Sequence, residues 1–214
     1  YGNGASPWVQ VYGDNGFIED AFTFARKYAP STCKLFYNDY NEYWDHKRDA
    51  IYSMCKSLYD KGLLDGIGMQ SHINANYDGF SGVASYTTAL KKYASIGCDV
   101  QITELDLKAS NAFDGTDATK DAEYTKQAYR YREIYDAIAE LREEGINYSN
   151  ITIWGNIDKN SWLQDSNSVG GASDGKKKQC PVLFDDYYHV KPAYWAFVDR
   201  NNLQPETKNI DIIQ

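Results

Sequence analysis

Residues 83–106 of the chain read VASYTTALKKYASIGCDVQITELD, and this stretch decides the fold. Apolar side chains recur at helical spacing from Val83 to Tyr93, which predicts an amphipathic helix. Gly97 follows, as expected of a left-handed residue that ends a helix. A short apolar strand is predicted immediately afterwards, over Asp99–Leu105. The stretch therefore predicts a helix, a glycine turn and a strand in direct succession.

The same succession recurs along the rest of the chain. Apolar residues at helical spacing predict further helices over residues 17–28, 51–59, 124–141 and 191–200. Other short apolar strands are predicted over Lys34–Tyr37, Gly66–Gln70 and Ile151–Trp154. Strands that alternate with helices form parallel sheets through right-handed crossovers. Two architectures satisfy this pattern, an open doubly wound sheet and a closed eight-stranded barrel.

Polar side chains at the strand ends distinguish the two architectures. At the end of each strand lie residues that a buried core would not contain, namely Asn38 and Asp39, Gln70 and His72, Glu104 and Asp106, and Trp154, Asn156 and Asp158. Functional side chains at the carboxyl ends of successive strands are typical of the TIM barrel. No Gly-rich phosphate-binding loop follows any strand, which argues against a nucleotide-binding sheet. We therefore predict an α/β TIM barrel, of which four strands can supply only half.

The composition narrows the classes of partner. The 214 residues include 22 Lys or Arg and 30 Asp or Glu, a formal net charge of −8. An acidic protein repels nucleic acid and anionic lipid, and no apolar segment is long enough to span a membrane, so we expect neither partner. The 19 Tyr, 5 Trp and 8 Phe offer flat apolar faces that suit sugars, although most of the tyrosines are expected in the core.

The cysteines give no sign of a metal site. Cys33, Cys55, Cys98 and Cys180 form no CxxC pair and have no His at ligand spacing. We therefore expect no metal ion and no other cofactor. The scattered cysteines are interpreted as buried small apolar residues rather than as a disulfide framework.

The strongest catalytic signal is a pair of carboxylates on one strand. Glu104 and Asp106 lie two residues apart, so they share one face of the strand. Like charges held close together raise one pKa unless a cation or a hydrogen-bond donor lies between them. His72, two residues beyond Gln70 on the neighbouring strand, could be that group. The spacing alone equally allows a solvated Glu104 and a histidine buried in the core.

Two tryptophans flank the polar loop after the last strand. Trp154 and Trp162 enclose residues 155–161, and two indole rings beside carboxylates could form the wall of a sugar-binding cleft. The alternative is that both rings pack in the core. Spacing alone does not decide between these interpretations.

Five motifs, taken in order over about residues 7–198, resemble one known family. They are Tyr37-Asn38-Asp39-Tyr40-Asn41, Gly68-Met69-Gln70-Ser71-His72, Ile102-Thr103-Glu104-Leu105-Asp106, Trp154-Gly155 with Ser161-Trp162, and Leu183-Phe184-Asp185 with Lys191-Pro192-Ala193-Tyr194-Trp195. The family is the glycoside hydrolase family 10 endo-xylanases. The resemblance implies an eight-stranded barrel that cleaves β-1,4-xylan with retention of configuration. Residues 1–214 would be the C-terminal half of its single catalytic domain, strands five to eight with their helices.

The resemblance also implies roles for eight residues. It makes Glu104 the catalytic nucleophile, His72 the residue that hydrogen-bonds and orients it, and Asp106 the support of His72. The positions that match the family's contacts with xylosyl units are Tyr40, Asn41, Gln70, Trp154 and Trp162. The implied substrate is xylan or a xylo-oligosaccharide. The implied location is extracellular, for a secreted enzyme that can belong to a larger modular protein.

Part of the family's machinery is absent from this sequence. By the resemblance, the general acid/base is a Glu that follows an Asn at the end of the fourth strand, shortly upstream of Tyr1. The first four strands, with a Lys, a His and a Trp of the glycone side, are also absent. The sequence begins with neither an initiator Met nor a leader, so we expect its true start upstream and the N-terminal half barrel as its partner. The loop predicted over residues 164–180 is longer than is usual for the family.

Two other functions stay open at the level of sequence. A barrel that kept the cleft and lost its acid/base would be a non-catalytic xylan-binding module, and the residues upstream of Tyr1 distinguish it from an enzyme. Activity on cellulose or mixed-linkage glucan is a third hypothesis. It arises because xylose and glucose units differ by one hydroxymethyl group.

Overall fold

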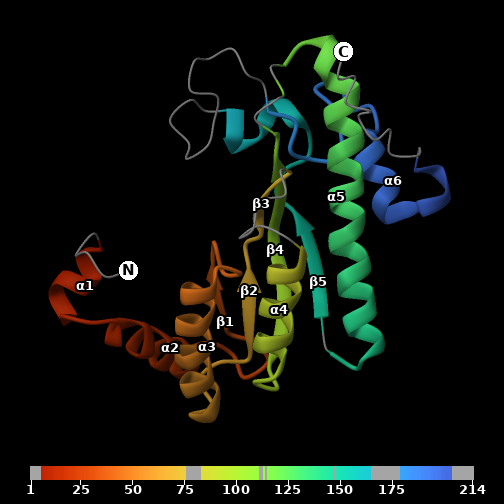
Figure 1. The fold of residues 1–214 in the computed structure, drawn as a ribbon. Helices are drawn as coiled ribbons and strands as arrows, with labels where there is room; N and C mark the ends of the chain where they lie inside the picture. Colours follow the sequence, from red (N-terminus) through yellow and green to blue (C-terminus); the bar gives the residue numbers. More distant parts are fainter. Residues whose placement is uncertain are drawn as a thin grey trace.

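The computed structural model describes residues 6–75, 83–110, 113, 115–146, 148–164 and 179–203. A sheet of parallel strands lies at its centre (Figure 1), composed of β1 (Phe36–Asp39), β2 (Gly66–Met69), β3 (His72–Asn74), β4 (Asp99–Lys108) and β5 (Tyr148–Ile153). Strands β1, β2, β4 and β5 follow one another across the sheet in chain order. Strand β3 continues the path of β2 and pairs with the far half of β4.

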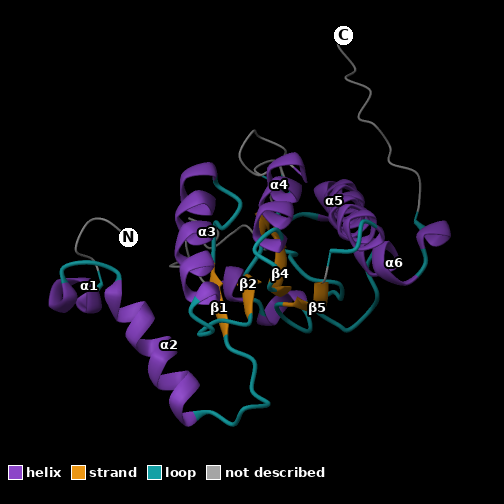
Figure 2. Cartoon of the chain, turned by 90° about the horizontal axis from the view of Figure 1, so that it is seen from below, coloured by secondary structure: helices purple, strands orange, loops and turns teal. Residues whose placement is uncertain are grey.

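Helices cover one face of this sheet. The described α-helices are α1 (Pro7–Tyr12), α2 (Gly16–Tyr28), α3 (Asp45–Asp60), α4 (Val83–Ala94), α5 (Asp117–Glu143) and α6 (Pro192–Val198). Short 3-10 helices cover Asp158–Asn160, Trp162–Gln164 and Arg200–Asn202. Figure 2 shows α3, α4 and α5 in an arc along the row of strands, and α6 packs on α5. None of the described helices combines the length and the hydropathy needed to cross a membrane.

The strand order identifies the kind of sheet. A doubly wound sheet reverses its strand order and carries helices on both faces, whereas a barrel adds each new strand beside the last with its helix outside. The described strands follow the second pattern. The prediction of part of an α/β barrel is confirmed.

The core lies between the sheet and the arc of helices. Ile67 and Val100 face it from the strands at 1% and 0% exposure. Tyr86, Tyr93 and Tyr131 pack against them from α4 and α5 at 2%, 0% and 0% exposure. Part of the high tyrosine content therefore serves the core.

The predicted helix ends are confirmed at three glycines, whereas some strand bounds differ. Gly62, Gly97 and Gly145 have positive φ angles of 70°, 93° and 86°. Strand β1 begins later than predicted, β4 continues to Lys108, and β5 begins earlier, at Tyr148. These bounds depend on pairing between strands, which the local sequence does not contain. The short elements α1 and β3 are not predicted. Each contains too few residues for a helical or strand period to be recognised.

Strand β4 carries one extra residue between Ile102 and Asp106, relative to β2 and β3. Ile102 pairs with Met69 of β2, and Asp106 pairs with His72 of β3, so three residues of β4 lie opposite two residues of its neighbour. The pairing of β4 with β5 shifts in the same place, between Ile102 and Leu105. Such a bulge changes the face on which the following side chains lie.

The bulge determines which side chains at the carboxyl end of β4 face the core and which face the cavity. Before it, Ile102 packs in the core, and beyond it Leu105 and Leu107 do so, all three at 0% exposure. Glu104 and Asp106 alternate with these leucines and face a cavity instead. The two carboxylates therefore share one face, as their spacing predicts.

All four cysteines have free thiols. Cys55, Cys98 and Cys180 are buried, as expected, and burial raises the pKa of the Cys180 thiol to about 12. Cys33 is exposed, so the expectation of burial is wrong for this residue. The reason is its place in the turn between α2 and β1, outside the core.

Both predicted loops lie partly outside the described residues. For the loop over 164–180, residues 165–178 are outside, and its two ends meet. Gln164 Nε2 donates to the carbonyl of Gln179 at 2.6 Å, and the Gln179 N–H donates to Gln164 Oε1 at 3.0 Å. The loop predicted over 108–119 is shorter than expected, because β4 reaches Lys108 and α5 begins at Asp117.

A substitution at Gly66 can test how tightly β1 and β2 pack against each other at Phe36. It pairs with Phe36, and a Cβ atom at residue 66 would lie 2.6 Å from Cδ1 of that ring. We expect Gly66→Ala to lower the free energy of unfolding by about 1–3 kcal/mol, the usual range for overpacking. Urea denaturation measures this. The loss should shrink when Phe36→Ala is already present, and an equal loss in both backgrounds would contradict the packing argument.

Candidate active site

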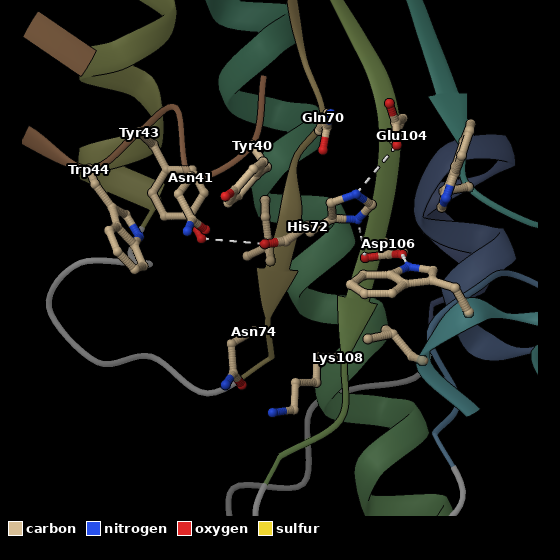
Figure 3. Close-up of a pocket in the computed structure, with 14 residues that line it drawn as sticks. Tyr40, Asn41, Tyr43, Trp44, Gln70, His72, Asn74, Glu104, Asp106 and Lys108 are labelled. Carbon is tan, nitrogen blue, oxygen red and sulfur yellow. Dashed lines mark hydrogen bonds and ion pairs between the residues drawn. The ribbon is translucent and has the colours of Figure 1, made fainter. Parts of the chain in front are cut away.

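A cavity of about 840 Å³ opens at the carboxyl ends of the strands (Figure 3). It is lined by Tyr40, Asn41, Tyr43, Trp44, Gln70, His72, Ile73, Asn74, Glu104, Asp106, Lys108, Trp154, Trp162 and Leu163. All eight site residues named from the sequence are in this set. The structure therefore brings together side chains from β3, β4 and the segments after β1, β2 and β5.

The carboxylate of Glu104 is held from two sides. Asn38 Nδ2 donates a hydrogen bond to Glu104 Oε1 at 2.9 Å, and His72 Nε2 lies 3.4 Å from Oε2. The hydroxyl of Thr103 donates to Asn38 Oδ1 at 2.6 Å, which directs the amide nitrogen at Glu104. Glu104 thus has a fixed orientation while its side chain keeps 16% exposure to the cavity.

His72 lies between two carboxylates. Its Nδ1 is 3.0 Å from Asp106 Oδ1, and its Nε2 faces Glu104. The side chain of Asp106 is 1% exposed, and its second oxygen accepts a hydrogen bond from Trp162 Nε1 at 2.7 Å. The rings of His72 and Trp162 meet edge to face with centroids 5.0 Å apart. Asp106 therefore joins the histidine to the aromatic wall.

The pKa of His72 is raised above its ordinary value. Burial has the largest single effect and lowers the pKa, but the hydrogen bond with Asp106 and the charges of Asp106, Glu104 and Glu42 together outweigh it. Both ring nitrogens face carboxylate oxygens, and both can donate only when the ring carries two protons. The site therefore favours an imidazolium, which faces Asp106 on one side and Glu104 on the other.

Flat aromatic faces form the walls of the cavity. Tyr40, Trp44, Trp154 and Trp162 line it with 50%, 37%, 44% and 37% of their surface exposed. Core packing is therefore the wrong interpretation of Trp154 and Trp162. The Nζ of Lys47 lies 3.7 Å from the centre of the Tyr40 ring, and this cation–π contact helps to fix the ring.

Several residues of the cavity are missed at the level of sequence. Asn74 and Lys108 pair in register across β3 and β4, and Figure 3 shows both beside the same space. Lys108 extends the two-residue period of Glu104 and Asp106, which is the signal that could have found it. The contact of Asn38 with Glu104 has no local signal, because the two residues lie 66 positions apart.

Residues 2–200 match the model of glycosyl hydrolase family 10. The chain belongs to this family. It is 50% identical over 198 residues to endo-1,4-beta-xylanase Y of Acetivibrio thermocellus, covering 92% of this chain and 16% of that protein. It is 38% identical over 202 residues to an endo-1,4-beta-xylanase of Geobacillus stearothermophilus, covering 91% of this chain and 56% of that protein.

Solved structures of family 10 agree with the fold. A Clostridium thermocellum endo-1,4-beta-D-xylanase, in complex with xylohexaose, superposes with a TM-score of 0.76 at 48% identity, over 97% of this chain and 36% of that chain. A family 10 protein of Paenibacillus barcinonensis gives a TM-score of 0.79 at 30% identity, over 95% and 57%. The chain thus spans between 16% and 57% of the length of these relatives. Its sheet corresponds to the second half of the family 10 barrel.

Asp106 can be tested as the partner that raises the pKa of His72. We expect Asp106→Asn to lower that pKa, because the neutral amide removes a charge and leaves the effect of burial dominant. NMR titration of the imidazole measures the change. Asp185→Asn is the matched control, because Asp185 pairs with His189 at 3.1 Å and should leave His72 unaffected. An unaltered titration of His72 in Asp106→Asn would show that this carboxylate does not govern the ring.

Proposed function

We propose that the protein containing this chain is an endo-1,4-β-xylanase that cleaves internal β-1,4-xylosidic bonds with retention, with Glu104 as nucleophile. The observation that carries the proposal is the Glu104 carboxylate, which Asn38 and His72 orient at the base of an aromatic-walled cavity. The relatives support the substrate, since they are named endo-1,4-beta-xylanases and one solved relative holds xylohexaose.

Glu104 is suited to nucleophilic attack. In the retaining mechanism an ionised carboxylate attacks the anomeric carbon, and water then hydrolyses the covalent glycosyl-enzyme. The imidazolium of His72 lies 3.4 Å from Glu104, so its positive charge faces the carboxylate before the attack and again when the carboxylate leaves. Asn38 fixes the second oxygen, so the carboxylate cannot rotate away from the sugar. His72 in this proposal transfers no proton of the substrate.

The walls of the cavity suit a neutral sugar chain. We place xylosyl units against the exposed faces of Tyr40, Trp154 and Trp162. Asn41 and Gln70 supply amide groups that can donate to and accept from sugar hydroxyls. A neutral polymer needs no charge attraction, which is compatible with the net charge of −8.

The acid/base of the reaction must come from outside the described residues. A retaining enzyme places its two carboxyl groups about 5 to 5.5 Å apart. In the described lining of the cavity the other carboxyl is Asp106, and both of its oxygens are already bonded, to His72 and Trp162. We propose that the general acid/base is a Glu after an Asn in the N-terminal half barrel, which completes the domain as the partner of this chain.

A non-catalytic xylan-binding barrel is the second candidate. The occupied oxygens of Asp106 favour it, because the described residues then contribute a single available carboxylate to the cavity. An Asn-Glu pair upstream of Tyr1 supports the enzyme, and a replaced Glu supports the binding module. Assays on xylan and on carboxymethylcellulose separate xylanase activity from activity on glucans.

We also propose that the enzyme acts outside the cell as part of a larger modular protein. Xylan is too large a polymer to cross a membrane intact. The chain covers 16% of xylanase Y, so that relative carries much further sequence. One solved relative is described as an intracellular xylanase, which makes the comparison of culture supernatant with cell extract the deciding measurement.

The role of Glu104 can be tested in the complete barrel. We expect Glu104→Ala to lower turnover of xylan by roughly 10⁴-fold or more while binding and fold survive, because no covalent intermediate can form. Azide should restore part of the rate by entering the vacated space. Glu144→Ala is the control, since Glu144 lies exposed at the end of α5. Near-normal rates in Glu104→Ala would contradict the assignment.

The need for a partner can be tested by expressing residues 1–214 alone. Within the described sheet β1 and β5 each pair on one side, and Trp8, Phe24 and Tyr28 are 62%, 59% and 72% exposed. Open strand edges and exposed apolar surface favour association. We expect aggregation of the isolated chain and rescue by the N-terminal half. A cooperative melt, a monomeric elution volume and xylan hydrolysis by the chain alone would refute this.

A further inference from the structure

The segment after β1 contributes four side chains to the cavity and one to the interior. Figure 3 shows four of its residues around the cavity, namely Tyr40, Asn41, Tyr43 and Trp44. Glu42, in the middle of the same segment, is 1% exposed. The backbone carbonyl of Glu42 accepts a hydrogen bond from the hydroxyl of Tyr93 at 2.6 Å, which anchors the segment to α4.

The carboxyl of Glu42 is hydrogen-bonded to Ser71, at the junction between β2 and β3. Its Oε1 accepts hydrogen bonds from the backbone N–H of Ser71 at 3.0 Å and from the Ser71 hydroxyl at 3.1 Å. Ser71 is completely buried and has a φ angle of 63°, in the left-handed region that a residue with a side chain rarely adopts. The hydroxyl of Tyr86 lies 2.7 Å from Ser71 Oγ. Contacts of this kind are what keeps a strained backbone conformation in place.

Ser71 stands where the register with β4 changes. The residue pairs are Met69 with Ile102 before it and His72 with Asp106 after it. The carbonyl of Ser71 also accepts a hydrogen bond from the backbone N–H of Asp106 at 3.4 Å. Ser71 therefore lies opposite the bulge of β4 and directly before His72, at the point where the register with Asp106 is set.

We propose that Glu42 is a positioning residue which, through Ser71, locks His72 between Glu104 and Asp106 and ties that triad to the substrate wall formed by the segment 40–44. One side chain thereby couples two sides of the cavity, the aromatic wall after β1 and the histidine on β3. The part of this inference that concerns turnover rests on the proposed xylanase function. The part that concerns His72 does not.

Electrostatics add a pH dependence to this contact. Burial raises the pKa of Glu42 to about 7, against the opposing effects of its own backbone, the hydrogen bonds from Ser71 and the charge of His72. The other titratable groups that face it are the hydroxyls of Tyr43, Tyr86 and Tyr93. Glu42 Oε2 has no hydrogen-bond partner among the described residues, which adds to the cost of ionising the group.

The sign of the pH dependence follows from the raised pKa. The folded protein binds the proton of Glu42 more tightly than the unfolded chain does, whose Glu has a pKa near 4.5. The contribution of this group to stability is therefore complete below about pH 4.5 and is lost as the pH rises through about 7. Ionised Glu42 in turn helps to raise the pKa of His72.

Three variants of the complete barrel test the proposal. Glu42→Gln keeps an oxygen that can accept from Ser71 but removes the charge, whereas Glu42→Leu removes both. Tyr86→Phe removes another contact of Ser71 and leaves the Glu42 contact intact, so it serves as the control for loss of stability alone. The measurements are kcat and KM on xylan, the melting temperature from pH 4 to 8, and the NMR titration of His72.

We expect Glu42→Leu to lower kcat roughly 10- to 100-fold and to raise KM, because both His72 and the segment 40–44 shift. Glu42→Gln should retain most of the kcat of the unaltered enzyme, flatten the fall in melting temperature between pH 4.5 and 7, and lower the pKa of His72. Tyr86→Phe should lower the melting temperature while the His72 titration stays in place.

Two outcomes would overturn the proposal. In the first, folded Glu42→Leu keeps the kcat, the KM and the His72 titration of the unaltered protein, so that only stability is lost. In the second, Tyr86→Phe shifts the His72 titration as far as Glu42→Gln does. If the unaltered barrel proves inactive on xylan, the xylanase proposal fails by itself, and the His72 titration still decides the role of Glu42.

Discussion

The bulge in β4 is the constraint on which the site depends, because it moves the pairing partner of His72 from Leu105 to Asp106. In an unshifted register a leucine would lie beside the histidine. Glu104 would then turn toward the core, away from Asn38. Bulges are over-represented next to active sites because they redirect individual side chains. Here the extra residue presents two carboxylates on one face without interrupting the buried leucines that alternate with them.

Asp106 connects this geometry to the aromatic wall. Its two oxygens bond His72 and Trp162, so the ring that orients Glu104 and a ring that faces the cavity share one buried anchor. The loop that carries Trp162 is secured by a buried ion pair at Asp158, four residues before it. Asp158 lies 2.9 Å from Lys191, whose ammonium also donates to two backbone carbonyls at 2.6 Å. Removing either partner would leave a buried charge without compensation.

Three carboxyl groups surround the ring of His72. Glu42, Glu104 and Asp106 all lie close enough to raise its pKa, and the charge of His72 in turn opposes the effect of burial on the pKa of Glu42. Burial opposes the charged form of both Glu42 and His72. Each of the three carboxyl groups is held by a positioned partner. Asn38 donates to Glu104, the backbone N–H of Ser71 donates to Glu42, and His72 bonds Asp106. Such a cluster is preorganised, which is what a nucleophile in a sugar-binding cavity requires.

The sequence by itself determined the alternation of helices and strands, the glycines at the helix ends, and the polar residues that follow each strand. These follow from local periods of 3.6 and 2 residues and from the freedom of glycine at positive φ. The bulge is also visible in the sequence. The apolar residues Val100 and Ile102 fall on even positions and Leu105 and Leu107 on odd ones, so the two-residue period shifts between the two pairs. Only the tertiary structure decided three hydrogen bonds: Asn38 donates to Glu104, Trp162 donates to Asp106, and Ser71 donates to Glu42. These partners lie 66, 56 and 29 residues apart, and such contacts exist only after the parallel strands have brought their carboxyl ends together.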